Sequence, residues 1–115
     1  MHQGEGRLES THGVVTFAQG DYVPVPRTIT HRWRFAQGTD PRLLVIESMS
    51  EVRFPKRYMN THGQLLEHSP FCERDIRPPT ELLTYDEAGD FEVRIAKHGW
   101  LHSYHLRHHP FDVVG

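Results

Sequence analysis

The sequence predicts an all-β fold, and three observations support this. Short alternating or apolar stretches recur along the chain, and residues typical of turns separate them. No stretch before residue 50 keeps the 3.6-residue period of an amphipathic helix. Apolar residues make up only 37% of the 115 residues, which suits the thin core of a sandwich or barrel.

The first two expected strands form a hairpin. Residues 6–11 alternate between polar and apolar side chains, and His12 and Gly13 are a two-residue turn signal. Val14 and Val15 then begin a β-branched return strand.

A turn at residues 19–21 leads to a third alternating stretch, residues 22–26. Pro24 and Pro26 cannot donate hydrogen bonds to a ladder. We therefore expect residues 22–26 to form an edge strand or to pair on one side only.

Two more strands are expected before residue 50. In residues 31–35, His31, Trp33 and Phe35 share one face and two arginines share the other, which predicts a half-buried strand. Residues 42–49 are the most apolar stretch and predict a strand that is covered on both faces.

The pattern changes after residue 50. Prolines interrupt residues 51–84, whose apolar side chains follow no period, so we expect a long irregular connection. Alternation returns at residues 91–95, followed by a turn at residues 98–99 and a return strand over residues 100–107. This last part predicts a β-hairpin.

One motif resembles a metal-binding strand of the cupin type of barrel. Gly20, Pro26 and His31 have the spacing of a cupin motif whose histidine is a ligand, although Thr28 stands where that motif has a glycine. A divalent metal needs three or four converging ligands, and we expect the other cupin ligands to lie before Met1. We therefore interpret His31 as a structural histidine; it remains the one metal candidate, and no catalytic residue is assigned.

A second cluster of histidines lies near the end of the chain. On a strand, His102 and His108 share one face and His105 and His109 the other, so no three converge. We expect solvated histidines that titrate near neutrality. The alternative is a small cupin enzyme with a metal bound by His31 and one or more of His102, His105 and His108.

Other reactive side chains give weaker patterns. The pair Glu67 and His68, and the charged run at residues 73–75, are typical of acid–base groups but also of ion pairs that hold a loop, which we favour. Cys72 is expected to be a small buried residue. With a single cysteine, no internal disulfide forms, which agrees with a reducing compartment.

Charge and hydropathy argue against two classes of partner. Lys and Arg number 13 against 15 acidic residues, without a basic stripe, so nucleic-acid binding is not expected. No apolar run approaches the roughly 20 residues of a transmembrane helix, so a membrane is not expected either.

Several strings resemble one enzyme family. GQLLEHSPFCERDIRPP (residues 63–79) and HHPFDVVG (residues 108–115) resemble segments of the bacterial homogentisate 1,2-dioxygenases. GDYVPVPRTITHRW and RFPKRYMNTHGQLLEHSP resemble them too, in the same order and over nearly the whole chain.

The resemblance implies a cytoplasmic, homo-oligomeric enzyme with two cupin-like (jelly-roll) barrel halves. Such enzymes use non-haem Fe(II), bound by two histidines and a glutamate, and O2 to open the aromatic ring of homogentisate in tyrosine and phenylalanine catabolism. In the family, the iron ligands follow the segment that HPFDVVG resembles.

The resemblance therefore implies an internal fragment. We expect residues 1–50 to be the second half of a cupin-like barrel, residues 51–84 an irregular connection, and residues 85–115 a β-hairpin leading towards a catalytic barrel that is missing. Such a fragment is expected to bind no iron and to be inactive alone. The alternative is a non-catalytic cupin-like module for assembly or partner binding, which we base on an exposed apolar tail at residues 111–114.

Overall fold

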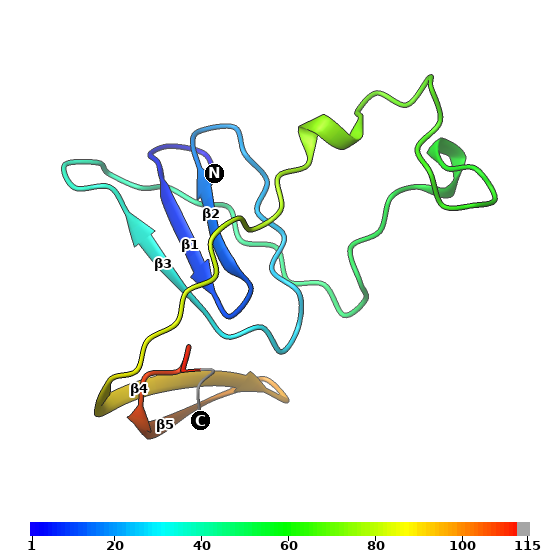
Figure 1. Ribbon diagram of the computed structural model, residues 1–115. Coiled ribbons are helices and arrows are strands. Elements are labelled where there is room, and N and C mark those ends of the chain that lie inside the picture. Colours follow the sequence, from blue (N-terminus) through cyan, green and yellow to red (C-terminus); the bar gives the residue numbers. More distant parts are fainter. Residues whose placement is uncertain (113–115) are drawn as a thin grey trace.

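The computed structural model describes residues 1–112 and shows two antiparallel β-sheets joined by a long irregular segment (Figure 1). The first sheet has the strand order β2-β1-β3, and the second is the hairpin β4-β5. The predicted all-β class is confirmed, and the antiparallel sheets are consistent with a cupin-like fold. The strands are β1 (Gly6–Ser10), β2 (Gly13–Phe17), β3 (His31–Phe35), β4 (Ala88–Lys97) and β5 (Trp100–His108).

The β1–β2 hairpin forms as predicted. Ser10 pairs with Gly13, and the Ser10 hydroxyl donates to the Gly13 carbonyl over 3.1 Å, which closes the turn. Gly13 has a φ of 120°, and a β-carbon there would lie 2.4 Å from the Glu81 carbonyl oxygen. Only glycine allows this backbone conformation and this close approach.

The apolar face of the three-stranded sheet carries most of its core. Phe17, which is 3% exposed, meets Trp33 and Phe35 with ring centroids 5.3 Å and 6.0 Å apart. Leu8 lies opposite Trp33 and is also buried. The predicted alternation of β3 is thus confirmed, because its aromatic residues face this core.

The second hairpin also follows the prediction. Lys97 pairs with Trp100 across His98 and Gly99, whose φ values of 53° and 78° are both positive. A two-residue turn of this kind matches the right-handed twist of the flanking strands.

Residues 22–26 do not form the predicted strand. At the outer edge of β2, the Thr80 amide instead donates to the Val14 carbonyl over 3.3 Å. Pro24 and Pro26 lack amide hydrogens, so residues 22–26 could pair on one side only, and the Thr80 amide occupies the Val14 carbonyl.

The predicted strand at residues 42–49 is also wrong. Only Arg42 forms a bridge, with Gln3, and Leu44, Val45 and Ile46 are 79%, 82% and 78% exposed. The composition of this stretch favours a strand, but a strand needs a neighbour, and none lies beside it within residues 1–112.

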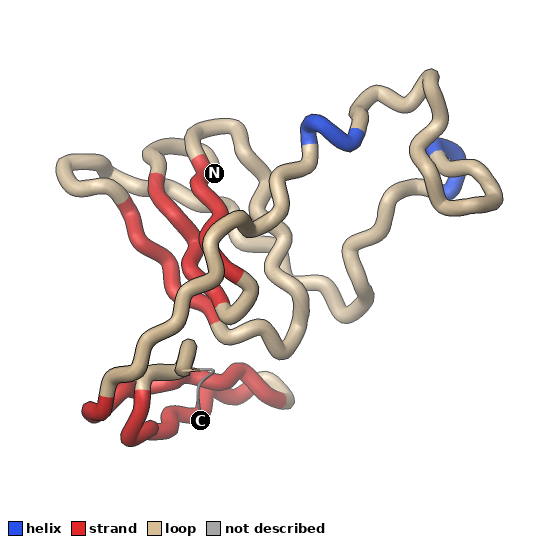
Figure 2. Tube along the Cα trace, viewed as in Figure 1, coloured by secondary structure: helices blue, strands red, loops and turns tan. Residues whose placement is uncertain are grey.

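Residues 51–84 contain two short 3-10 helices, η1 (Lys56–Tyr58) and η2 (Glu73–Asp75), and are otherwise irregular (Figure 2). A small local cluster forms where Phe71 meets Phe54 and Tyr58, with ring centroids 5.3 Å and 5.9 Å apart. No helix among the described residues has the length and apolar character needed to cross a membrane.

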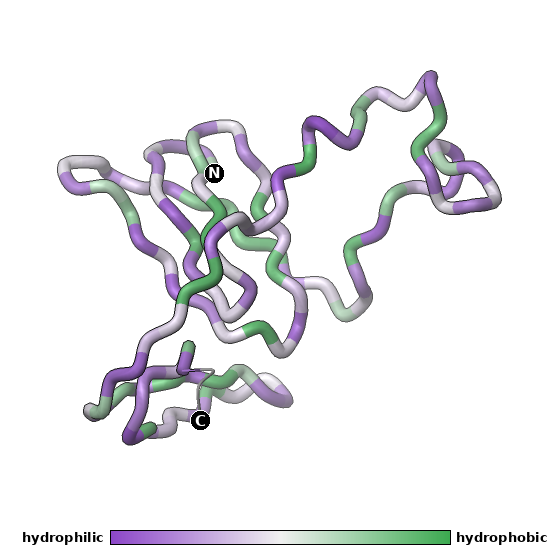
Figure 3. Tube along the Cα trace, in the orientation of Figure 1, coloured by the Kyte–Doolittle hydropathy of each residue, from purple (hydrophilic) through white to green (hydrophobic). Residues whose placement is uncertain are grey.

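The chain is far more open than its mass requires. Its radius of gyration is 16.8 Å, against about 13 Å for a compact domain of this length. Its accessible surface is 9928 Å², about 3,400 Å² more than the roughly 6,500 Å² of a compact monomer of this mass. Figure 3 shows apolar and polar residues intermixed along the extended segments.

We expect Phe17→Ala to destabilise the first sheet by about 3–5 kcal/mol, because it removes a buried ring and leaves a cavity. Urea unfolding followed by the fluorescence of Trp33 measures this. Leu82→Ala is the matched control, since Leu82 is 66% exposed, and should change the free energy of unfolding by less than about 0.5 kcal/mol. Equal losses in both variants would contradict this assignment of the core.

Candidate functional site

The most buried charged group among residues 1–112 is Glu9, the fourth of the five residues of β1, with 1% of its residue surface exposed. Arg7 approaches one carboxylate oxygen at 2.8 Å, and Arg32 approaches the other at 2.6 Å. Arg34 lies 3.7 Å from the second oxygen. The alternation of antiparallel strands places all four side chains on the same face, opposite Phe17 and Trp33.

This arrangement keeps Glu9 ionised. Burial alone would raise the pKa of Glu9, but the hydrogen bond from Arg32 and the charges of Arg32, Arg7 and Arg34 together lower it. The cluster therefore holds one carboxylate and three guanidinium groups. Such a group organises a sheet, and it carries no free base or nucleophile for chemistry.

His109, just after β5, is the second buried polar group of interest and is 5% exposed. Its ring centroid lies 4.2 Å from the ring centroid of Tyr85 and 5.0 Å from the ring centroids of Phe91 and Phe111. The Phe111 amide donates to His109 Nδ1 over 3.1 Å. The expectation of a solvated histidine is therefore wrong for His109, because the aromatic side chains around it exclude water.

Phe111 connects this aromatic cluster to the Glu9 cluster. Phe111 is 2% exposed, and the Arg32 guanidinium carbon lies 5.9 Å from its ring centroid. The expected exposed tail at residues 111–114 is thus wrong at Phe111, while residues 113–114 lie outside the described residues. One arginine therefore contacts both Glu9 and the end of the second hairpin.

Burial lowers the pKa of His109, and the charge of Arg32 lowers it further, with a smaller contribution from Arg34. Glu87 and Glu9 act in the opposite direction. His109 is therefore neutral near pH 7, which agrees with its Nδ1 accepting a hydrogen bond.

The metal candidate His31 lies at the start of β3 and is exposed. Its Nδ1 is 2.9 Å from the Ile29 carbonyl oxygen. Within residues 1–112, no three His, Cys, Asp or Glu side chains are grouped so that they could hold a metal ion. The structure therefore does not bring His31 together with the histidines of the second hairpin.

Those hairpin histidines, His102, His105 and His108, are exposed on β5, as expected. His105 Nδ1 lies 2.7 Å from the Asp90 carboxylate. This is a single exposed pair across the hairpin. It does not include His102 or His108, and no group of three that could hold a metal forms within residues 1–112.

The charged run at residues 73–75 does not form the expected ion pair within residues 1–112, and a hydrogen bond holds its loop instead. The Cys72 amide donates to the Asp75 carboxylate over 2.8 Å, and this hydrogen bond lowers the pKa of Asp75. Cys72 itself is exposed, so the expectation of a buried cysteine is wrong. Glu67 and His68 are both exposed and make no hydrogen bond with another described residue.

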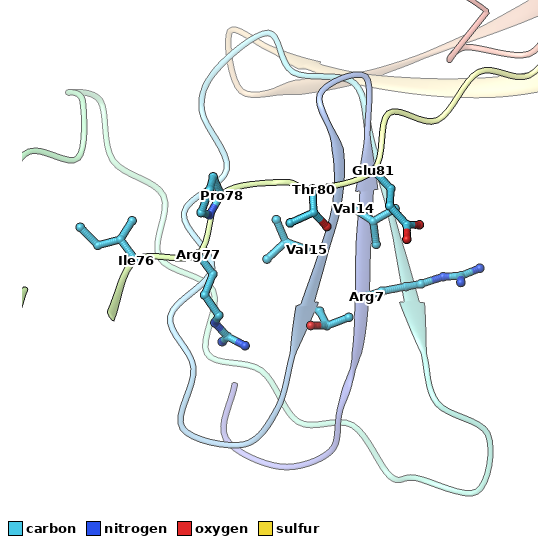
Figure 4. Close-up of a pocket in the computed structure, with 9 residues that line it drawn as sticks. Arg7, Val14, Val15, Ile76, Arg77, Pro78, Thr80 and Glu81 are labelled. Carbon is cyan, nitrogen blue, oxygen red and sulfur yellow. The ribbon is translucent and has the colours of Figure 1, made fainter. Parts of the chain in front are cut away.

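A groove of about 390 Å³ runs between the outer edge of β2 and residues 76–81 (Figure 4). Arg7 and Arg77 lie on opposite sides of it, with Val15 between them. Arg7 is paired with Glu9 and Arg77 with Asp21, so neither guanidinium is free for a ligand anion. Glu81 is the carboxylate that lines the groove, and no described histidine or cysteine lines it with Glu81.

Sequence reasoning missed Glu9, and a signal for it was present. Two arginines were expected on one face of residues 31–35, and an acidic residue on a neighbouring strand is their natural partner. The burial of His109 had no comparable local signal, since Tyr85 lies 24 residues before it.

Comparison with known proteins gives one informative match. The chain is 36% identical over all of its 115 residues to "Putative dioxygenase SSO1533" of Saccharolobus solfataricus. The matched region is 29% of that protein's length, so the chain spans less than a third of this relative. No protein-family model and no solved structure matches the chain.

We expect Glu9→Gln to lower the free energy of unfolding by about 3 kcal/mol, because three arginines would then lack their shared carboxylate. Glu92→Gln is the matched control: Glu92 also pairs with an arginine, Arg94, but on an exposed face. It should cost much less than Glu9→Gln, because an exposed ion pair is screened by water and contributes little to stability. A loss no greater than that of the control would show that the Glu9 cluster does not stabilise the sheet.

We expect the stability of the chain to fall as the pH drops below the ordinary histidine pKa of about 6.5. The folded state lowers the pKa of His109, so the unfolded chain binds more protons below the ordinary histidine pKa of about 6.5. Stability is therefore fully present above that pH and is lost as the pH falls towards the lowered pKa. Urea midpoints measured across this range test the prediction.

His109→Asn identifies the group responsible. Asparagine can keep an acceptor for the Phe111 amide but does not titrate, so the variant should be less stable and its stability should depend less on pH. His105→Asn, at an exposed position, should keep the full pH dependence. An unchanged slope in His109→Asn would assign the effect to another group.

Proposed function

We propose that these 115 residues are part of a ring-cleaving dioxygenase of the homogentisate 1,2-dioxygenase type. One observation carries the proposal: the match to a protein named as a dioxygenase extends over the whole chain. The strings at residues 63–79 and 108–115 support the finer assignment, because they resemble the bacterial homogentisate enzymes.

Fe(II) in such an enzyme would bind and activate O2 for attack on the aromatic ring. The described residues do not fit that metal, because a facial triad needs two histidines and a carboxylate on one site, and no such group of three forms within residues 1–112. We therefore place the iron ligands in polypeptide beyond these 115 residues. In this proposal, no residue of this chain, His31 included, is a ligand.

The part that this chain plays is then architectural. Glu9 and Arg32 fix the three-stranded sheet, and Arg32 with Phe111 fixes the second hairpin against it. The whole enzyme would act on homogentisate and O2 in the cytoplasm, as a homo-oligomer, in tyrosine and phenylalanine breakdown.

A second candidate function is that of a non-catalytic module for assembly. Exposed apolar side chains favour it: Leu44, Val45 and Ile46 are each more than three-quarters exposed. Apolar surface that is contiguous along the chain is typical of an interaction site.

The dioxygenase proposal is tested by comparing two chains. We expect the coding sequence to continue in frame beyond residue 115 with histidine and glutamate codons, and the extended protein to consume O2 with homogentisate once Fe(II) is added. The 115-residue chain should show no turnover and less than stoichiometric iron. Oxygen uptake and metal analysis of both purified proteins measure this.

Three other results would each refute one part of the proposal. Turnover by the 115-residue chain alone would refute the placement of the iron ligands. Turnover of another hydroxylated phenylacetate in preference to homogentisate would refute the substrate. An extended protein that binds iron but turns over none of these compounds would refute the dioxygenase proposal.

A further inference from the structure

The hairpin β4-β5 meets the first sheet through side chains that follow β5. Among residues 1–112, no Cα atom of β1, β2 or β3 lies within 8 Å of one in β4 or β5, and Figure 1 shows the hairpin apart from the first sheet. The Arg32 guanidinium carbon, from β3, lies 5.9 Å from the ring centroid of Phe111, which is buried. The position of the hairpin therefore depends on the contact of Phe111 with Arg32.

His109 holds Phe111 in place for this contact. The Phe111 amide donates to His109 Nδ1 over 3.1 Å, and the Asp112 amide donates to the His109 carbonyl over 2.9 Å. The ring centroids of His109 and Phe111 are 5.0 Å apart. The turn at residues 109–112 is thus built on a neutral imidazole, because only the neutral ring has a nitrogen that accepts a hydrogen bond.

The charged and titratable groups around His109 come from both sheets. They are Arg32 and Arg34 in β3, Glu9 in β1, Glu87 and Tyr85 before β4, and Asp112 in the turn itself. β4 contributes Phe91, which carries no charge. Burial and the two arginines lower the pKa of His109, and the two glutamates do not offset them. A proton on His109 is therefore disfavoured as long as the turn stays in place.

A proton on His109 would also remove the basis of the turn. Both nitrogens of a charged imidazole are donors, so neither orientation of the ring could accept from the Phe111 amide. That amide is buried, and a buried donor without a partner is costly. The new charge would moreover lie among aromatic rings and near Arg32. The proton is accommodated at lower cost when the turn leaves the cluster and His109 reaches water.

We propose that residues 109–111 form an acid-sensitive latch, in which uptake of one proton by the His109 imidazole releases Phe111 from Arg32 and frees the hairpin while the first sheet stays folded. The first sheet has its own ladders and its own aromatic core around Phe17, and neither includes His109. The latch does not depend on the dioxygenase proposal, and activity plays no part in its test.

Hydrogen exchange of the 115-residue chain, followed by NMR between about pH 7.5 and about pH 5, tests the latch. Protection factors, which correct for the intrinsic pH dependence of exchange, are measured at several low urea concentrations. The amides of the β4–β5 ladder should lose up to about tenfold in protection per pH unit below about 6.5, the limit for one proton. At each pH they should be less protected than the amides of β1 and depend less on urea, because they exchange through a smaller opening.

His109→Asn tests the group that takes up the proton. Asparagine keeps an acceptor for the Phe111 amide but does not titrate, so the protection of the hairpin should no longer change with pH. His102→Asn is the matched control, because His102 is exposed on β5 of the same hairpin. It should keep the full pH dependence of the wild-type chain.

Phe111→Ala opens the latch without a proton. The protection of the hairpin should then be low at every pH, and the His109 ring, measured by its proton shifts, should titrate near the ordinary pKa of about 6.5. Phe71→Ala is the matched control, since it removes a ring from the separate cluster with Phe54 and Tyr58. It should leave both the hairpin protection and the titration of His109 unchanged.

Three results would overturn the proposal. The first is equal protection and equal urea dependence of the hairpin and β1 amides at every pH, which would show that the hairpin does not open separately. The second is a wild-type pH dependence in His109→Asn, and the third is a His109 ring that titrates in Phe111→Ala as it does in the wild type. The first measurement uses the wild-type chain alone and decides the proposal even where a variant fails to fold.

Discussion

The described structure depends on the burial of one carboxylate. Glu9 lies in the central strand of the first sheet, and its charge is tolerable there only because Arg7, Arg32 and Arg34 surround it. Since Arg32 and Arg34 belong to β3, this requirement fixes which strand pairs with β1 and in which register. A slip by one residue would turn Arg32 and Arg34 to the apolar face and leave the buried carboxylate with Arg7 alone.

Arg32 also links the buried carboxylate to the second hairpin. The Arg32 guanidinium donates a hydrogen bond to the Glu9 carboxylate and lies over the Phe111 ring. Phe111 in turn packs against His109. The hairpin is therefore held by one cation–π contact and an aromatic cluster, a small contact for an element of this size. Its remaining surface, including Trp100 at 74% and Leu101 at 66% exposed, stays open to solvent.

Local rules predicted the elements that depend on local chemistry. Alternation and turn residues located β1, β2, β3 and the second hairpin, because side-chain period and turn geometry are properties of short segments. The predicted strand at residues 42–49 failed because pairing needs a neighbour that the sequence pattern does not supply. The burial of His109 and Phe111 was missed for a related reason: Arg32 and Tyr85, which cover them, lie far away in the sequence.

The candidate metal site at His31 was not found because no further ligand side chains lie near it among the described residues. Spacing along the sequence cannot show whether ligands from different strands come together. Gly20, Pro26 and His31 have a ligand-bearing spacing, yet a ligand set forms only where several strands bring side chains to one point. In residues 1–112, buried titratable side chains lie at the Glu9 cluster and in the aromatic cluster of His109, where Glu9 is paired with arginines and His109 Nδ1 accepts from the Phe111 amide. Chemistry that needs an open coordination position or a free base has no place in either. The open features of this chain are instead backbone edges and apolar side chains, which are completed by further polypeptide.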